Sequence, residues 1–158
     1  MAIFLYVIIV LALIVIFSSI RIIDQYEKGV VFTLGKFTSI RNPGLNFVVP
    51  IIQRMVVVDM RVRTTDIEKQ QVMTKDNVPV DVNGVVFFKV NKVDDAIIKV
   101  QDYEYAIAQY SQTALRDVIG GMTLDNVLVE RQQIGEEIRK IVDKETDPWG
   151  IKVDKIEL

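Results

Sequence analysis

The chain begins with a continuous apolar run. Residues 1–20 contain no charged residue, no Pro and no Gly, and the hydroxyl residues Ser18 and Ser19 come at the end of the run. As a helix rising about 1.5 Å per residue, this run would be about 30 Å long, the thickness of the hydrocarbon core of a bilayer. The pattern predicts an N-terminal transmembrane helix over residues 1–20.

A cleaved signal peptide and a helix buried in a globular core are the alternatives for this run. A signal peptide normally has basic residues before its apolar part and small residues at its cleavage site. Here the apolar part starts at the second residue and leads directly into Arg21. A core helix would show polar side chains at helical spacing on its outer face. An uncleaved membrane helix agrees best with the pattern.

Basic residues follow the apolar run, and none precedes it. Arg21, Lys28, Lys36 and Arg41 lie shortly after its end. The loop with the excess of Lys and Arg usually stays on the cytoplasmic side of a membrane. The flanks therefore predict a single-pass anchor with the following domain in the cytoplasm.

The next segment has the pattern of short antiparallel strands. Gly29 and Gly35 bracket the apolar strand candidate 30–34, as expected at strand boundaries. Asn42, Pro43 and Gly44 then form a turn triplet, in which Pro fixes one φ and Gly supplies a positive φ.

Residues 45–52 form a second apolar run, LNFVVPII, which does not alternate. Such a run is buried on both faces, either in a core or in lipid, and Pro50 argues against a central strand. One interpretation is a hydrophobic loop that enters the membrane surface beside the anchor, and the other is burial in the core. The residues predicted to contact the membrane are Phe47, Val48, Val49 and Ile51.

The middle of the chain predicts a long hairpin. Segments 54–62 and 65–74 are rich in β-branched residues, and the segment 78–90 alternates clearly at its start. Lys75, Asp76 and Asn77 lie between the last two segments and predict the tight turn that joins them.

The pattern after Asn91 becomes helical. We predict a short helix over 92–100 and a helix over 103–119 that is capped by Asp102 and ended by Gly120 and Gly121. A last helix is predicted over 124–146, with a candidate break near Val129, followed by a final strand over 151–158. The predicted organisation is a helix over 1–20, a membrane-proximal β-rich subdomain over 21–75 and an α/β subdomain over 76–158.

Composition argues against an enzyme. The chain has no Cys and no His, which excludes Ser-His and Cys-His nucleophiles and His-ligated metals. Ser39 and Ser111 have no evident activating partner, and Gly120-Gly121 lacks the Lys and Ser or Thr of a phosphate-binding loop. We predict no catalytic residue, no cofactor and no metal. Basic residues interleaved with aromatics are also lacking, so nucleic acid is not an expected partner.

Charge is distributed unevenly along the chain. Residues 21–64 carry 7 Lys and Arg against 3 Asp and Glu, whereas residues 65–158 carry 12 against 18. A basic membrane-proximal part would suit anionic lipid headgroups, although ordinary solvated charges explain the same counts.

Six segments in this order resemble one family. They are the apolar N-terminus, EKGVVFTLGKF, NPGLNFVVP, TKDNVPVDVNGVVFFKV, QTALRDVIGGMTLDNVLVERQQI and DPWGIKVDKIEL. Together they resemble a stomatin-like member of the stomatin, prohibitin and flotillin (SPFH, or band 7) superfamily. The resemblance implies an α+β fold, in which an N-terminal transmembrane helix precedes an SPFH domain with a small, mostly antiparallel sheet and packed helices.

The resemblance also implies a function. Such proteins are membrane-anchored scaffolds that form homo-oligomers, organise membrane microdomains and modulate channels, NfeD-type proteins and AAA membrane proteases. The alternative is a regulator that docks directly onto a membrane protease or channel without forming large assemblies. The family pattern implies turn, helix-packing or subunit-contact roles for Pro43, Gly44, Asp76, Asn77, Arg116, Arg131, Trp149 and Gly150. Relatives continue into a long coiled coil, of which no heptad run is present here.

Overall fold

The computed structural model describes residues 2–158 and divides the chain into two compact units. The first unit extends to Met60, and the second runs from Arg61 to Leu158. The division thus falls after Met60, whereas the sequence suggested a boundary between residues 75 and 76. Strands on the two sides of residue 75 pair with each other, so a boundary there would cut through a sheet.

The first unit begins with helix α1 (Ala2–Ser18). This helix has 17 residues and is therefore about 25 Å long. It ends at Ser18 because Ile20 already belongs to strand β1 (Ile20–Ile23) and pairs with Phe47. Among residues 2–158, no helix is both long enough and apolar enough to cross a membrane. The transmembrane helix predicted over residues 1–20 is therefore not supported.

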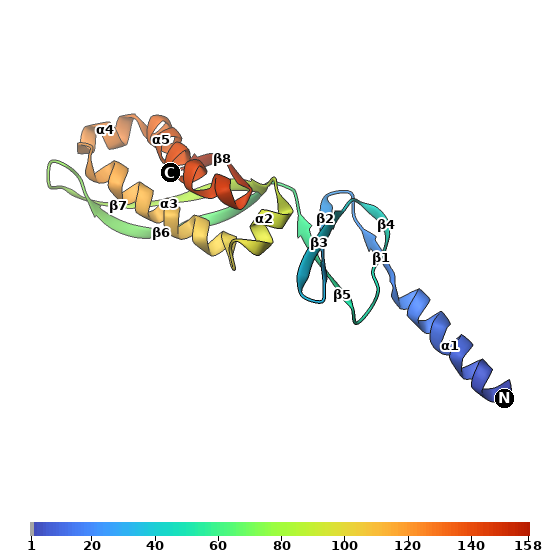
Figure 1. Ribbon diagram of the computed structural model, residues 1–158. Coiled ribbons are helices and arrows are strands. Elements are labelled where there is room, and N and C mark those ends of the chain that lie inside the picture. The colour runs from blue at the N-terminus through green and yellow to red at the C-terminus, as the bar shows by residue number, and fades with distance from the viewer. Residues whose placement is uncertain (1) are drawn as a thin grey trace. The chain divides into compact units, whose positions relative to one another are not determined.

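Two antiparallel sheets follow α1 in the first unit (Figure 1). Strand β1 pairs with β4 (Gly44–Phe47) in a two-stranded ribbon. Strands β2 (Glu27–Thr33), β3 (Lys36–Arg41) and β5 (Gln53–Asp59) form a three-stranded sheet with β2 in the centre. A methyl group on Gly29 would lie 2.8 Å from Ile23 Cδ1, so Gly29 leaves room for the ribbon to pack on the sheet through Ile23.

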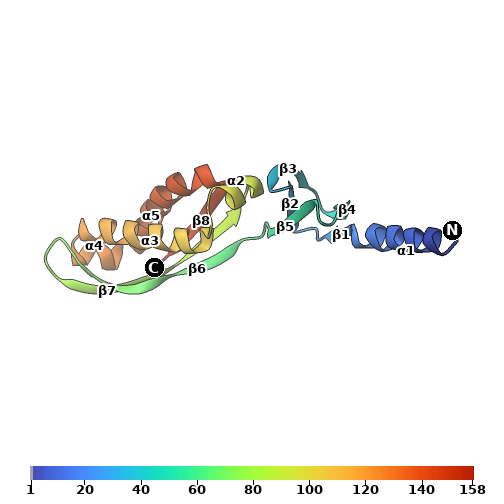
Figure 2. The same ribbon diagram turned by 60° about the horizontal axis from the view of Figure 1, so that its bottom comes forward.

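The second unit contains a three-stranded antiparallel sheet in the order β6–β7–β8. These strands are β6 (Arg63–Met73), β7 (Pro79–Val90) and β8 (Ile151–Glu157). The hairpin predicted across Asp76-Asn77 is confirmed, since Met73 pairs with Pro79. The first two strands are long enough to run along the whole length of the helices that cover them (Figure 2).

Helices α3 (Tyr103–Gly120) and α5 (Arg131–Thr146) cover one face of this sheet (Figures 1 and 2). The shorter helices are α2 (Val93–Ile98) and α4 (Leu124–Val129), and a 3₁₀ turn (Asp147–Trp149) joins α5 to β8. The predicted last helix is thus divided at Glu130, close to the candidate break at Val129. Asp102 caps α3 as predicted, because its Oδ1 accepts a hydrogen bond from Tyr105 N–H at 3.0 Å.

The core of the second unit lies between the sheet and the helices that cover it. Alternate residues of β7 point to the helices, while α3 and α5 bury one stripe each. The fully buried side chains here include Val86, Phe88, Ile107, Leu115, Ile119, Ile134, Ile138 and Val142. The α+β class predicted from the sequence is confirmed.

Candidate functional site

An exposed apolar surface lies on the β1–β4 ribbon. Ile20 pairs with Phe47 and Ile22 pairs with Leu45, and residues two apart in a strand share a face. All four side chains therefore lie on one face of the ribbon, opposite to Ile23, and all four are exposed. We call this face the ribbon patch.

A second apolar surface lies where the β2–β3 turn meets the segment between β4 and β5. Leu34 N–H donates a hydrogen bond to Ile52 O at 2.9 Å, which holds the two turns together. Leu34 and Ile51 have positive φ angles of 50° and 75°, which aliphatic residues rarely adopt. Both side chains project fully into solvent, with exposed fractions of 82% and 101%. We call Leu34, Val49, Ile51 and Ile52 the tip patch.

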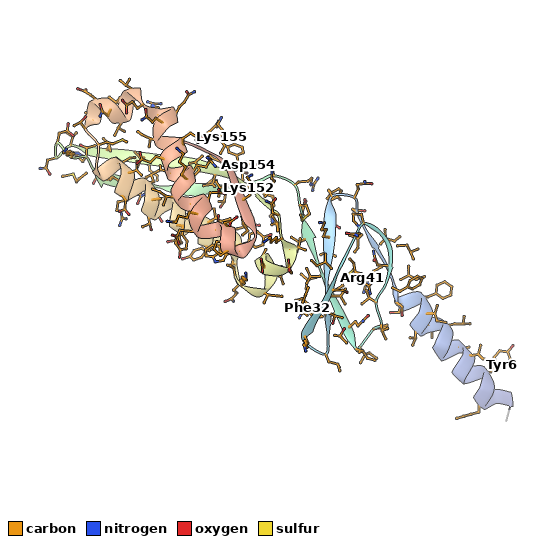
Figure 3. The ribbon with its side chains drawn as sticks, turned by 45° about the horizontal axis from the view of Figure 1, so that its top comes forward. Tyr6, Phe32, Arg41, Lys152, Asp154 and Lys155 are labelled. Atoms are coloured by element: carbon orange, nitrogen blue, oxygen red, sulfur yellow. The ribbon has the colours of Figure 1, made fainter. Side chains whose placement is uncertain are left out.

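Helix α1 is joined to this region through its C-terminal end. Ser19 O accepts a hydrogen bond from Val48 N–H at 2.8 Å, and the Ser19 hydroxyl donates to Val15 O. The helix carries exposed aromatic side chains at Phe4, Tyr6 and Phe17, of which Tyr6 is labelled in Figure 3. The first unit thus presents apolar side chains from a helix, a ribbon and two turns.

The four residues predicted to contact a membrane differ in exposure. Phe47, Val49 and Ile51 are exposed, but Val48 is only 6% exposed. Val48 follows strand β4, and its N–H donates to Ser19 O. Its side chain lies inside the unit and is not available for lipid contact. Sequence reasoning missed Leu34, although an aliphatic residue before Gly35 in a turn is unusual because turns favour polar residues.

Asp76 and Asn77 form the turn between β6 and β7, and Asn77 adopts a positive φ of 63°. Asp76 Oδ1 accepts hydrogen bonds from the Thr74 hydroxyl at 2.6 Å and from Leu124 N–H at 3.2 Å. The bond from Thr74 is the main reason why the pKa of Asp76 is lowered from its ordinary value, with a further contribution from Leu124 N–H. Asp76 therefore connects the hairpin turn to the first residue of α4.

Two further family positions lie at turns or in the packing of the second unit. Arg116 on α3 donates to Gln70 Oε1 at 3.2 Å, beside the irregular register of β6. Trp149 contacts Tyr110 edge-to-face, with ring centroids 5.5 Å apart. Both residues join a helix to a neighbouring element.

The two glycines among the family positions have backbone roles. Gly150 has a φ of 72°, and its carbonyl accepts from the N–H groups of Asn91 and Lys92. Gly44 has a φ of 117° and follows Pro43 at the start of β4, as predicted for the turn triplet. These positions set local backbone geometry.

Arg131 differs from the other family positions. It begins α5, is exposed, and has no ion pair within residues 2–158.

Residues 2–158 contain no group of three or more His, Cys, Asp and Glu side chains that could hold a metal ion. The apolar surfaces of the first unit are therefore the features of this structure that most clearly point to binding.

The chain is similar to proteins of one family. The family model described as SPFH domain / Band 7 family matches residues 21–158. A stomatin homolog of Pyrococcus horikoshii is 44% identical over 152 residues, which cover 96% of this chain and 57% of that protein. Stomatin of Mus musculus is 35% identical over 145 residues, which cover 90% of this chain and 51% of that protein.

A protein of Archaeoglobus fulgidus, described as uncharacterized, is 49% identical over 141 residues. The match covers 89% of this chain and 57% of the archaeal protein. The chain therefore spans little more than half the length of these relatives.

Proposed function

The chain is a stomatin-like member of the SPFH domain / Band 7 family, and from this premise we propose that it is a membrane-associated, self-associating scaffold. In this proposal it binds a lipid bilayer through its first unit, forms homo-oligomers and organises membrane microdomains. It thereby modulates membrane-protein partners, for which channels, NfeD-type proteins and AAA membrane proteases are the proposed classes.

The observation that carries the membrane part of this proposal is the exposed apolar surface of the first unit. Soluble monomeric proteins rarely expose large contiguous apolar patches, and such patches mark membrane or protein contacts. Here the ribbon patch and the tip patch both lie in the unit that begins with α1, and the end of α1 is hydrogen-bonded to the segment between them. Helix α1 and these patches would enter the apolar part of the bilayer together.

Charge supports the same assignment. Residues 21–60 carry 5 Lys and Arg against 3 Asp and Glu, and residues 61–158 carry 14 against 18. A basic unit next to apolar side chains is attracted to anionic headgroups by about 1 kcal/mol for each basic residue near the surface. The acidic second unit is repelled by the same surface, which leaves it free to contact proteins. The cytoplasmic location predicted from the basic residues remains part of the proposal.

Confinement to a surface would also favour self-association. Weak contacts between copies become effective when an anchor raises their local concentration. A scaffold of this kind needs no strong pairwise interface. A regulator that docks directly onto one membrane protease or channel remains the alternative, and it would bind its partner without forming large assemblies.

Vesicle flotation tests the membrane contact. We would compare the parent chain with a helix variant, Leu13→Asp with Phe17→Asp, and a patch variant, Phe47→Asp with Val49→Asp. The control is Ile98→Asp with Ile141→Asp, which places two carboxylates on exposed apolar positions of the second unit. With vesicles of phosphatidylcholine and phosphatidylglycerol, we expect the helix variant to lose most of its bound fraction and the patch variant to lose part of it.

The outcomes separate the parts of this proposal. Equal flotation of the patch variant and the control would remove residues 47 and 49 from lipid contact. Equal flotation of the helix variant and the control would remove α1. The mass of the parent chain in nanodiscs then tests assembly: a single copy that holds a membrane protease or channel tightly would favour the regulator.

A further inference from the structure

Two cavities of about 380 and 410 Å³ meet in the second unit at Arg131 and Leu158, which line both of them. The first cavity lies between β7, α4 and the start of α5, and most of its lining is aliphatic. Its main apolar side chains are Val80, Val82, Leu124, Val127, Leu128 and Ile134. We call it the apolar cavity.

The second cavity continues from Arg131 along the end of β8, and most of the residues that line it have polar or charged side chains. Gln132 and Glu136 line it from α5, and Lys155 and Glu157 line it from β8. Lys155 is labelled on β8 in Figure 3. We call it the polar cavity.

The acidic side chains that line the two cavities are each paired with another cation. Asp81 pairs with Lys69 at 2.9 Å, Glu136 pairs with Arg139 at 3.1 Å, and Glu157 pairs with Lys155. Arg131 lies between the cavities and, within the part of the chain that the structure describes, has no such partner. Its guanidinium is available for an anion from another molecule.

We propose that the two cavities bind an extended peptide segment of a protein partner. An aliphatic or aromatic side chain of the segment fills the apolar cavity, and an Asp or Glu side chain close to it in sequence binds Arg131. The following residues lie along the polar cavity beside β8. A guanidinium suits this role because it binds a carboxylate through two parallel hydrogen bonds.

The shape of the surface favours a peptide over a small amphiphilic anion. A single fatty chain with one carboxylate would occupy the apolar cavity and Arg131 but would leave the polar cavity empty. A peptide segment can carry apolar and polar side chains a few residues apart, so one segment can occupy both cavities. Leu128, which lines the apolar cavity, is itself exposed, and exposed apolar side chains beside a cavity are typical of interaction sites.

This proposal extends the proposed function from membrane contact to a docking surface. All of its residues belong to the second unit, and the residues assigned to lipid contact belong to the first. Loss of vesicle binding would therefore leave the docking surface intact, and the two proposals can fail separately.

Peptide selection on the full chain in nanodiscs tests the site. Random twelve-residue peptides displayed on phage would be selected against the parent chain, with empty nanodiscs used to remove background. We would measure binding of the enriched peptides to Arg131→Glu, to Leu128→Asp and to Lys140→Glu. Lys140→Glu is the matched control, because Lys140 is an exposed basic residue on α5 that lines neither cavity.

We expect the enriched peptides to carry an Asp or Glu close to a large apolar residue. Arg131→Glu and Leu128→Asp should each weaken their binding at least about tenfold, as expected for loss of a charged hydrogen bond or a buried contact, whereas Lys140→Glu should change it by less than about twofold. Replacing the acid by Lys in the peptide should restore binding to Arg131→Glu. The proposal is overturned if no peptide is enriched, or if the enriched peptides bind Arg131→Glu as well as the parent.

Discussion

At the scale of single residues, Asp76 joins two segments that are far apart in the sequence. Its carboxylate accepts from Thr74 in the β6–β7 turn and from the N–H of Leu124, the first residue of α4. An N–H in the first turn of a helix has no partner inside the helix. Asp76 thus replaces a local cap by one from another element.

This arrangement predicts a pH-dependent effect of Asp76→Asn. The pKa of Asp76 is lowered in the folded chain, chiefly by the Thr74 hydrogen bond, so the charged form stabilises the fold above the ordinary pKa of 3.8. That stabilisation is lost as the pH falls through the lowered pKa. We expect Asp76→Asn to lower the free energy of unfolding at neutral pH, and the difference from the parent to shrink below pH 3.8.

Urea unfolding at several pH values measures this difference. Asp125→Asn is the control, because Asp125 is an exposed carboxylate in the first turn of the same helix. A difference between parent and Asp76→Asn that stays constant with pH would show that the charge of Asp76 does not contribute.

Gly150 is a residue whose identity the backbone conformation dictates. Its φ of 72° is disfavoured for other residues, and a methyl group would lie 2.5 Å from Lys92 Cβ and 2.6 Å from Lys92 O. We expect Gly150→Ala to lower the free energy of unfolding by about 1–3 kcal/mol. At Gly121 the φ is −84°, and a methyl group would lie 3.5 Å from Val118 O, its nearest neighbour, so Gly121→Ala should change urea unfolding little. Equal effects of both substitutions would contradict this account.

At the scale of elements, α5 covers the outer edge of β8. Asp143 Oδ1 on α5 accepts a hydrogen bond from Val153 N–H at 3.0 Å. About two turns earlier on α5, Gly135 lies so close to β8 that a methyl group would be 2.6 Å from Ile156 O. The helix thereby protects an edge that would otherwise offer unpaired backbone groups to other strands.

The close approach at Gly135 predicts the effect of a single methyl group. Alanine is a better helix former than glycine by about 1 kcal/mol, yet in Gly135→Ala the added atom would push α5 away from β8. We expect a net loss of about 1–3 kcal/mol in the free energy of unfolding, measured by urea denaturation. In Gly120→Ala the nearest atom is 3.7 Å away, so this variant should be neutral or stabilising. A stabilised Gly135→Ala would show that α5 can move without cost.

The same elements show how much of the fold the sequence could predict. The hairpin of β6 and β7 and the capped helix α3 depend on local turn and periodicity rules, and both were predicted. The ribbon of β1 and β4 was not, because its strands are short and are separated by β2 and β3 in sequence. In the structure Ile20 belongs to β1, so α1 ends at Ser18 and does not reach the predicted residue 20. Residues 45–47 of the apolar run belong to β4. Non-local pairing of short strands leaves no periodic trace in the sequence.

The candidate sites could also be predicted from the sequence only in part. Phe47, Val48, Val49 and Ile51 were predicted to contact a membrane, and all of them except Val48 are exposed. Arg131 was predicted only as a packing or subunit-contact position. Its relation to two cavities follows from the approach of α4, α5 and the end of β8, which tertiary packing determines.

At the scale of the whole molecule, the two units have separate cores and separate surfaces. Each sheet is paired within one unit, and the buried apolar side chains of the second unit come from β6 to β8 and from α2, α3 and α5. The apolar surfaces assigned to lipid contact belong to the first unit. Folding and membrane binding should therefore separate when the chain is divided after Met60.

A fragment of residues 61–158 tests this separation. Because it keeps all strand pairs of the β6–β7–β8 sheet and the core beneath α3 and α5, we expect a single cooperative thermal transition by circular dichroism. Because it lacks α1, the ribbon patch and the tip patch, we expect it to stay at the bottom of a flotation gradient, whereas the full chain rises with the vesicles. A folded fragment that floats would transfer lipid contact to the second unit. An unfolded fragment would show that the second core needs the first unit to form.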